Sequence, residues 1–209
     1  MVKKRNNEIR GQKLYLRTPR LKDYKNWSNL RKESMEFLVP WEPAWQSQQH
    51  TLISYFRLLS VYKKRLRNQE QYSFFIFNNH QKLVGGVNVF NIRYGISQSC
   101  TLGYWIGLPY ANKGYMTEAL SLLIEFLFNN LKINRIEAAC LPHNSPSKKL
   151  LLKLNFVEEG YAKDYLKING KWEDHILFAL NYKEYYNKLI FHKTVKVYKA
   201  SSINTKNDS

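Results

Sequence analysis

Residues 101–118 read TLGYWIGLPYANKGYMTE, and within this stretch the chain changes from one periodic pattern to another. The first part consists of β-formers, with Tyr104 and Trp105 in the middle. Pro109 interrupts the strand, and a long helix begins at about Tyr115. The apolar residues of that helix recur at helical spacing: Met116, Ala119, Leu120, Leu123, Ile124, Leu127 and Leu131. The stretch therefore predicts a strand, a short turn and a helix with one buried face.

The turn, Ala111-Asn112-Lys113-Gly114, has the features of an anion site. The first N–H groups of a helix have no partner within the helix, and the helix dipole is positive at that end. Lys113 adds a positive charge, so a phosphorylated cofactor is the natural ligand. The turn alone fits an ordinary strand–loop–helix connection as well. Neither the P-loop pattern G-x-x-x-x-G-K-[ST] nor the dinucleotide pattern G-x-G-x-x-G occurs in the chain.

The composition indicates one globular domain with a basic surface. The chain has 209 residues, of which 44% are hydrophobic and 15% aromatic. Its 33 Lys and Arg residues outnumber 16 Asp and Glu residues, for a formal net charge of +17. This excess favours a polyanionic neighbour such as RNA or an anionic membrane, or attraction for a phosphorylated ligand. Accumulation of lysine in a chain that is also rich in Asn and Ile explains part of it equally well.

Two cysteines, Cys100 and Cys140, are far apart and form no C-x-x-C motif. This usage predicts a reducing compartment, with no disulfide framework and no metal site. The N-terminus, MVKKRNNEIR, is not followed by the apolar run of a signal peptide. No stretch approaches the roughly 18 apolar residues of a membrane-spanning helix. We therefore expect a cytoplasmic protein that does not enter a membrane.

The patterns along the chain predict a single α+β domain. The first half is expected to contain strand 13–17, a helix capped at Thr18-Pro19, an irregular segment 37–45 with two prolines and two tryptophans, a helix from about 47 to 67, and strands 72–77 and 83–90. After the stretch described above come strand 135–141, helix 145–154 and a hairpin of 161–168 and 173–180, turning at Asn169-Gly170. The strands before the long helix form an antiparallel meander, and strand 135–141 is expected to lie parallel to the strand before the helix.

Four segments in this order closely resemble the GCN5-related N-acetyltransferase (GNAT) family. They are GYWIG-x-P-Y-x-x-K-G-Y-M-T-E-A-L at 103–120, R-I-E-A-A-C-L-P-H-N-x-x-S at 135–147, L-L-x-K-x-x-F-x-x-E-G-Y-A at 151–162, and D-Y-L-K-I-N-G-K-W-x-D-H at 164–175. Within the family the chain is similar to the Rim-type branch, which acetylates the N-terminal amine of ribosomal proteins. The segment PWEP at 40–43 resembles the ribosomal protein S5 alanine N-acetyltransferases of that branch.

The resemblance spans about Leu14 to Tyr182 and implies the GNAT fold. That fold is a mixed central sheet flanked by helices, with an antiparallel meander, a splayed parallel pair at the cofactor and a closing hairpin. The implied organisation is a basic N-terminal tail at 1–13, an N-acetyltransferase domain at 14–183 and a basic, partly disordered C-terminal tail at 184–209.

The resemblance also implies acetyl-CoA as cofactor. In the family, backbone amides of the turn hold the pyrophosphate, the strand before the turn pairs with the pantetheine arm, and an Asn contacts that arm. The matching residues are Ala111, Asn112, Lys113, Gly114, Tyr115 and Met116 for the turn, Tyr104, Trp105 and Ile106 for the strand, and Asn144. One position departs from the family, because Asn112 replaces the first Gly of the turn. Asn tolerates left-handed conformations, so we expect the turn to form.

The implied chemistry is direct transfer of the acetyl group through a tetrahedral intermediate. Ser147 is the candidate acid for the leaving thiolate, although it also fits a serine in the first turn of a helix. An α-amine with a pKa near 7.7–8.0 is about 10–15% neutral at pH 7, whereas a lysine is neutral only about 0.04% of the time. An enzyme for N-termini therefore needs little base, and Glu42 is the candidate base or anchor for the substrate ammonium. The residues expected to line the substrate site are Trp41, Glu42, Cys140, Asp164 and His175.

The sequence thus predicts an N-acetyltransferase for the N-terminal alanine, or a similar small residue, of a ribosomal protein such as S5. The basic surface suits contact with rRNA near that substrate. One alternative is an acetyltransferase for a small-molecule amine, although the chain is short of the acids that a polycation needs. Another is a non-catalytic RNA-binding or ribosome-binding assembly factor. The oligomeric state is left open by the sequence.

Overall fold

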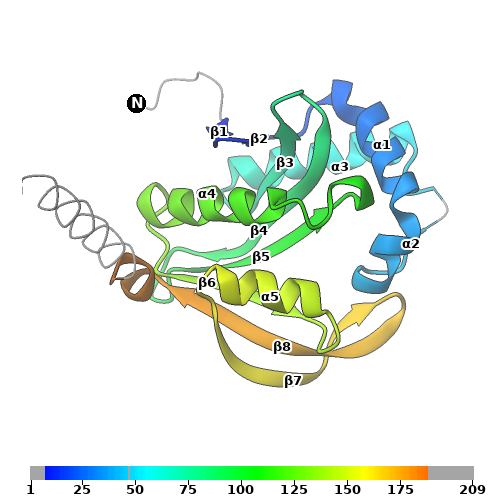
Figure 1. Cartoon of the computed structure of the whole chain (residues 1–209). Helices are drawn as coiled ribbons and strands as arrows, with labels where there is room; N and C mark the ends of the chain where they lie inside the picture. The colour runs from blue at the N-terminus through cyan, green and yellow to red at the C-terminus, as the bar shows by residue number, and fades with distance from the viewer. Residues whose placement is uncertain (1–7, 47, 188–209) are drawn as a thin grey trace, which may run out of the picture.

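The computed structural model describes residues 8–46 and 48–187. It contains one mixed sheet, and the strands are ordered β1-β2-β3-β4-β5-β6-β8-β7. The strands are β1 Ile9–Arg10, β2 Leu14–Arg17, β3 Tyr72–Asn78, β4 Leu83–Arg93, β5 Ser99–Ile106, β6 Arg135–Cys140, β7 Val157–Ile168 and β8 Lys171–Asn181. The helices are η1 Leu21–Asp23, α1 Tyr24–Glu33, α2 Met35–Leu38, η2 Val39–Trp41, α3 Leu52–Arg67, η3 Leu108–Tyr110, α4 Tyr115–Asn129 and α5 Ser145–Lys153. The predicted α+β class is confirmed, and the predicted elements follow one another in the expected order, with β1, α2 and the short η helices in addition (Figure 1).

Helices cover both faces of the sheet and define two cores (Figure 1). On one face, α4 and α5 pack on the sheet through a large cluster that includes Leu120, Leu123 and Leu151. On the other face, α1 and α3 pack on β3 through a smaller, more aromatic cluster, including Trp27 and Tyr55. The predicted apolar face of the long helix lies in the first cluster, because its residues share one side at helical spacing.

Strands β5 and β6 form the parallel pair, and they separate after a short paired stretch. Their register joins Ser99 to Arg135 and Thr101 to Glu137, and no pairing follows. Beyond Thr101, β5 pairs only with β4, and beyond Glu137, β6 pairs only with β8. Alternate N–H and C=O groups on the facing edges are therefore left for another partner. This splay opens the sheet from its edge, as expected for the predicted fold.

The N-terminal boundary differs from the prediction, because Ile9–Arg10 of the expected tail form β1 and pair with β2. A tight turn explains the pairing, since the Gly11 N–H donates to the Leu14 carbonyl at 2.9 Å. A Cβ at Gly11 would lie 2.4 Å from Glu118 Oε1 of α4, so a larger residue there would displace the end of that side chain. At the other end, residues 182–187 are helical, and the rest of the expected tail lies outside the described residues.

The predicted helix start at Thr18-Pro19 was wrong, because both residues lie outside any helix and the first helical turn begins at Leu21. Asp23 sets the start instead, since its carboxylate accepts the Arg20 N–H at 2.8 Å and pairs with buried Arg17 at 2.6 Å. The next helix begins at Leu52 and is capped by the Thr51 hydroxyl, which accepts the Ser54 N–H. The start of the first helix is thus fixed by the pairing of Asp23 with Arg17 of β2, a contact that the local sequence did not indicate.

The segment 37–45 is partly helical, because α2 and the short η2 occupy its first half and irregular backbone its second. The closing hairpin matches the prediction. Asn169 and Gly170 have φ angles of 43° and 85°, which are the left-handed values of a two-residue hairpin turn. Among the described residues, no helix has the length and apolar character to cross a bilayer.

Candidate active site

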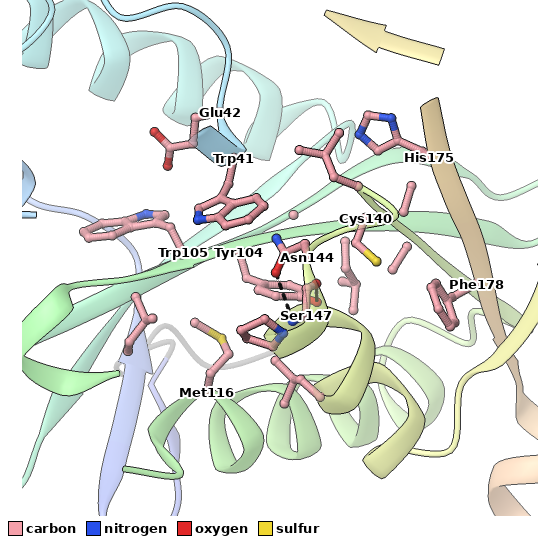
Figure 2. A pocket seen from close by; sticks show the side chains of 18 of the residues that line it. Trp41, Glu42, Tyr104, Trp105, Met116, Cys140, Asn144, Ser147, His175 and Phe178 are labelled. Carbon is pink, nitrogen blue, oxygen red and sulfur yellow. Dashed lines mark hydrogen bonds between the residues drawn. The ribbon is translucent and has the colours of Figure 1, made fainter. Parts of the chain in front are cut away.

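A cavity of about 860 Å³ occupies the gap between β5 and β6. It extends from the N-terminus of α4, past α5, to the segment 37–42 and the β7–β8 hairpin. Figure 2 shows Tyr104, Asn144, Ser147 and Cys140 gathered in the middle of this cavity, with Glu42 at one side. The cavity thus joins the helix end, the splayed strands and the aromatic segment.

The turn at one end of the cavity is shaped by two left-handed residues. Ala111 is extended, Asn112 has φ 58°, and Gly114 has φ 81° and forms the N-cap of α4. No side chain caps this helix, so the N–H groups of its first turn stay available. Asn112, which replaces the first glycine of the family's turn, adopts the left-handed conformation as expected.

Nearly all of the predicted cofactor residues border the cavity. Those that line it are Tyr104, Trp105, Ile106, Ala111, Asn112, Gly114, Tyr115, Met116 and Asn144. Lys113, which was also predicted, is absent from the lining.

Ser147 stands at the centre of a small polar cluster. Its hydroxyl lies 2.7 Å from the Tyr104 hydroxyl, and its N–H donates to the Asn144 side chain at 3.1 Å. Asn144 is the N-cap of α5, so its carbonyl oxygen is used to fix the helix end. Burial raises the pKa of Tyr104, with a smaller opposing effect of the bond to Ser147. The Tyr104 phenol is therefore neutral at physiological pH.

Cys140 is buried beside this cluster, at the end of β6. Burial raises the pKa of the Cys140 thiol, and a hydrogen bond with Ser147 opposes that rise. A protonated, buried thiol is a weak nucleophile, so the geometry offers no support for a covalent acetyl-cysteine. Cys100 is buried as well, and both thiols are free.

The Glu42 carboxylate is held by an ion pair. Arg31 donates to both of its oxygens, one of them at 2.7 Å, and Trp45 Nε1 donates to it at 2.9 Å. The Arg31 guanidinium lies over the rings of Trp45 and Trp105, at 4.5 and 4.9 Å from their centroids. A carboxylate held by a bidentate guanidinium is a poor base and a poor anchor for another cation. This arrangement instead fixes the segment after η2 against α1 and β5.

The remaining substrate-lining candidates fall in different places. Trp41 lines the cavity, and its ring lies 5.4 Å from the His143 ring. His175 also lines the cavity, is 3% exposed, and contacts the Glu173 carbonyl through Nδ1 at 2.9 Å. Asp164 does not line it, because this residue lies at an irregular position of exposed β7, where φ is 46°.

A main-chain bond closes one side of the cavity. The Asn169 N–H, at the tip of the β7–β8 hairpin, donates to the Glu42 carbonyl at 2.8 Å. This bond joins the hairpin to the segment that carries Trp41, and both border the cavity. The edge of the cavity on this side is therefore a bridged rim, formed by the two segments that this bond joins.

The donor set suits a phosphorylated, elongated ligand. Free N–H groups at the start of α4 would hold an anion, and the open edges of β5 and β6 would pair with an amide-containing arm. No group of three or more Asp, Glu, His or Cys side chains that could hold a metal occurs among residues 8–46 and 48–187.

The sequence analysis missed Arg31, Trp45 and the hydroxyl of Tyr104. Arg31 and Glu42 are eleven positions apart on segments of different structure, so no helical or strand spacing links them. Tyr104 was assigned through its backbone, but its side chain reaches Ser147 from 43 positions away. The one available signal was the alternation of side chains along β5, which places Tyr104 on the face of the sheet that α5 covers.

Comparison with known proteins gives one consistent result. The model of the acetyltransferase (GNAT) domain matches residues 13–157. The [ribosomal protein uS5]-alanine N-acetyltransferase of Escherichia coli is 39% identical over 150 residues, which are 71% of this chain and 77% of that protein.

Solved structures agree in fold. Mycobacterium smegmatis RimJ in complex with CoA-disulfide superposes with a TM-score of 0.79 at 31% identity, over 82% of this chain and 83% of that one. The ribosomal-protein-S5-alanine acetyltransferase of Vibrio fischeri superposes with a TM-score of 0.77 at 30% identity, over 83% and 96% of the two chains.

Proposed function

Because this chain belongs to the acetyltransferase (GNAT) family, whose domain matches residues 13–157, we propose that it acetylates the N-terminal alanine of ribosomal protein uS5. The chain is an N-acetyltransferase, and acetyl-CoA is its acetyl donor. The observation that carries the choice of acceptor is the 39% identity to an enzyme named for that substrate.

The chain's own residues fit the donor. The first turn of α4, with Gly114 as its N-cap, presents uncapped N–H groups to a diphosphate. The unpaired edge of β5, from Leu102 to Ile106, suits the amides of the pantetheine arm. The cavity of about 860 Å³ is large enough for an elongated ligand.

The bridged rim fits an acceptor that enters by its end. The Asn169–Glu42 bond closes the rim between the hairpin and the aromatic segment, so a chain terminus reaches the cavity more readily than an internal stretch of backbone. An N-terminal amine also suits a cavity in which the Glu42 carboxylate is already paired with Arg31 and is a poor base. An α-amine is about 10–15% neutral at pH 7, so orientation supplies most of what the reaction needs.

Bound acetyl-CoA supplies a thioester whose acyl carbon an amine attacks and whose leaving group is a thiolate. Ser147, with its N–H fixed by Asn144, holds a hydroxyl in the cavity that would protonate the leaving sulfur. N–H groups on the open strand edges would stabilise negative charge on the carbonyl oxygen. His175 lines the acceptor side and would hold or relay the amine proton.

Glu42 takes a positioning role in this proposal. Its carboxylate is occupied by Arg31 and Trp45, so it orders the segment that carries Trp41 instead of accepting the amine proton. This assignment replaces the base role that the sequence indicated for it.

The direct test is mass spectrometry of ribosomal proteins from cells with and without the gene. The proposal expects uS5 to lose the mass of one acetyl group, located at the N-terminal alanine, when the gene is deleted. Re-expression of the wild-type chain should restore it, and the Gly114→Val variant should not. Loss of acetyl from another ribosomal N-terminus would keep the activity and change the acceptor. Unchanged ribosomal proteins, with turnover of small amines by the purified enzyme, would overturn the proposal.

We further propose that the enzyme meets its substrate in the cytoplasm, close to rRNA. The support is the formal charge of +17 and the basic end of α3, which carries Lys64, Arg65 and Arg67 in its last turn. Association with purified ribosomes should weaken steeply between low and moderate salt, because counterions are released on binding. Association that does not change with salt would contradict the rRNA contact without affecting the acetylation proposal.

A further inference from the structure

The closest polar contact in the middle of the cavity joins two hydroxyl groups. Tyr104 Oη and Ser147 Oγ lie 2.7 Å apart, and the two residues come from β5 and α5. Figure 2 shows both side chains beside Asn144, near Cys140. A distance of 2.7 Å is that of a well-formed O–H···O bond, so one hydroxyl donates and the other accepts.

The chemistry of the two hydroxyl groups favours Tyr104 as the donor of this bond. The Ser147 backbone is fixed because its N–H donates to the Asn144 side chain, but its hydroxyl hydrogen rotates freely. Tyr104 Oη lies within hydrogen-bond distance of Ser147 Oγ, and a phenol, which is more acidic than an alcohol, is the better donor of the two. When Tyr104 donates, the Ser147 hydrogen is released to point elsewhere, and Cys140 is one such direction in the free protein.

We propose that Tyr104 is a positioning residue for proton transfer: its hydroxyl donates to Ser147 Oγ and thereby aims the Ser147 hydrogen at the leaving sulfur. This inference rests on the proposed function, in which Ser147 is the acid. It gives the Tyr104 side chain a role separate from that of the β5 backbone, which faces the pantetheine arm.

The proton balance is closed within this arrangement. The bond between the acyl carbon and sulfur breaks, and its electron pair goes to sulfur. Ser147 gives its proton to that sulfur. The attacking nitrogen has to lose a proton to become an amide, and that proton, held or relayed by His175, restores the Ser147 hydroxyl. Tyr104 keeps its own proton throughout, because burial raises its pKa. Its hydrogen bond stabilises Ser147 Oγ after that oxygen has given up its proton and before it regains one.

The test uses the full-length enzyme, acetyl-CoA and a synthetic peptide that begins with the alanine N-terminus of uS5. Thiol release is measured for wild type, Tyr104→Phe, Ser147→Ala and the double variant. We expect Tyr104→Phe to lower kcat about tenfold, the effect of one typical hydrogen bond. The KM for acetyl-CoA should stay within about twofold, because the β5 backbone is unchanged. Ser147→Ala should lower kcat about 100-fold, as expected for loss of an acid catalyst.

The double variant separates a role through Ser147 from a structural one. If Tyr104 acts by directing Ser147, adding Tyr104→Phe to Ser147→Ala should change kcat by less than about twofold. Multiplication of the two single effects would overturn the inference, as would a Tyr104→Phe enzyme with the wild-type kcat. A loss confined to the KM for acetyl-CoA would also overturn it, because the hydroxyl would then serve cofactor binding.

Tyr55→Phe is the matched control. Tyr55 is fully buried in the smaller core, and its hydroxyl donates to the Arg20 carbonyl at 2.9 Å, outside the cavity lining. This variant should lower the melting temperature and leave kcat unchanged. Absence of wild-type turnover on the uS5 peptide would count against the proposed acceptor, whereas wild-type turnover with an unaffected Tyr104→Phe enzyme would count against this inference alone.

Discussion

The two ends of the cavity are formed by different kinds of group, main-chain N–H groups at one end and side chains at the other. The proposed cofactor end, from Ala111 to Met116 at the start of α4, presents main-chain N–H groups whose directions depend on two left-handed residues. The proposed acceptor end, from Trp41 to Trp45 with Arg31, is held by an ion pair between side chains and by a guanidinium lying over aromatic rings. One end depends on backbone conformation, and the other depends on long-range contacts between side chains.

Because of this difference, the two ends should tolerate amino-acid substitutions to different degrees. Main-chain donors survive most substitutions, because each residue other than proline carries an N–H, and they fail only where φ is constrained. A side-chain network fails when any partner is removed, because the remaining partner is left buried without compensation. We therefore expect substitutions at the proposed acceptor end to change acceptor binding while acetyl-CoA binding is retained.

The largest expected effect is that of Gly114→Val. Gly114 has φ 81°, where a β-branched residue is strained, so the backbone will move to relieve that strain. Two misdirected N–H groups, at about 1.5 kcal/mol each, would weaken CoA binding about 100-fold. Isothermal titration with CoA measures this directly.

Gly95→Val is the matched control for that experiment. A Cβ at Gly95 meets no atom within 4 Å, as at Gly114, but its φ is outside the positive range. The control should bind CoA as the wild type does. Equal affinity of the Gly114→Val protein would mean that side chains, and not the α4 turn, hold the cofactor, and the contrast between the two ends would be lost.

An intermediate effect is expected from Arg31→Met at the acceptor end. The variant leaves the Glu42 carboxylate, which is 19% exposed, without its cation. We expect a loss of about 2 kcal/mol, or about 4–8 °C in melting temperature, and a higher KM for the acceptor peptide. CoA affinity should stay within about twofold.

Glu42→Gln tests the same end of the cavity, because it keeps the shape of the side chain but removes its charge and replaces one of the two oxygens that accept from Arg31 and Trp45. As a positioning residue, Glu42 should show a raised peptide KM and an unchanged shape of the kcat pH profile. A folded Glu42→Gln enzyme that loses kcat about 100-fold, with a flattened acidic limb of the profile, would restore Glu42 as the base.

The strand, turn and helix at the proposed cofactor end could be predicted from the sequence because their determinants are local. A strand, Pro109, a turn with Asn112 and Gly114, and an apolar helix follow one another within a short stretch, so propensity and periodicity apply directly. The same holds for the turn at Asn169-Gly170. The splay of β5 and β6 was expected only from the resemblance to a family.

The acceptor end could not be predicted in this way. Glu42 was singled out for its position between aromatic residues and prolines, but its partner Arg31 lies on α1, where it looks like any exposed helical charge. Asp164 was placed in the site by its motif, although an irregularity in β7 keeps it out of the cavity. Contacts between distant segments, which tertiary packing alone determines, decide both outcomes.

The smallest expected effect concerns His50, which packs against the acceptor end. Its ring lies 5.2 Å from Trp27 and 4.6 Å from Trp45. Burial, and then the charges of Arg31 and Lys32, lower its pKa to about 4, with Glu42 opposing them.

A histidine whose pKa is lowered in the folded protein is protonated first in the unfolded chain, so acid favours unfolding. The contribution of His50 is complete above pH 6.5 and is lost as the pH falls through about 4. After a discount for the partial exposure of the ring, we expect a loss of about 1 kcal/mol at pH 5 relative to pH 7, or about 2–4 °C.

Thermal unfolding of wild type, His50→Gln and His80→Gln at pH 7 and pH 5 isolates this contribution. His80 is exposed on the β3–β4 turn, so its replacement should leave the acid-induced shift unchanged. His50→Gln should reduce that shift, because the uncharged amide has no proton to gain. Since His50 contacts the acceptor end and not the α4 turn, stabilisation by saturating CoA should be the same for wild type and His50→Gln at both pH values. If His50→Gln left the acid shift intact, the aromatic packing around Trp45 would have to be open enough to solvate the imidazolium.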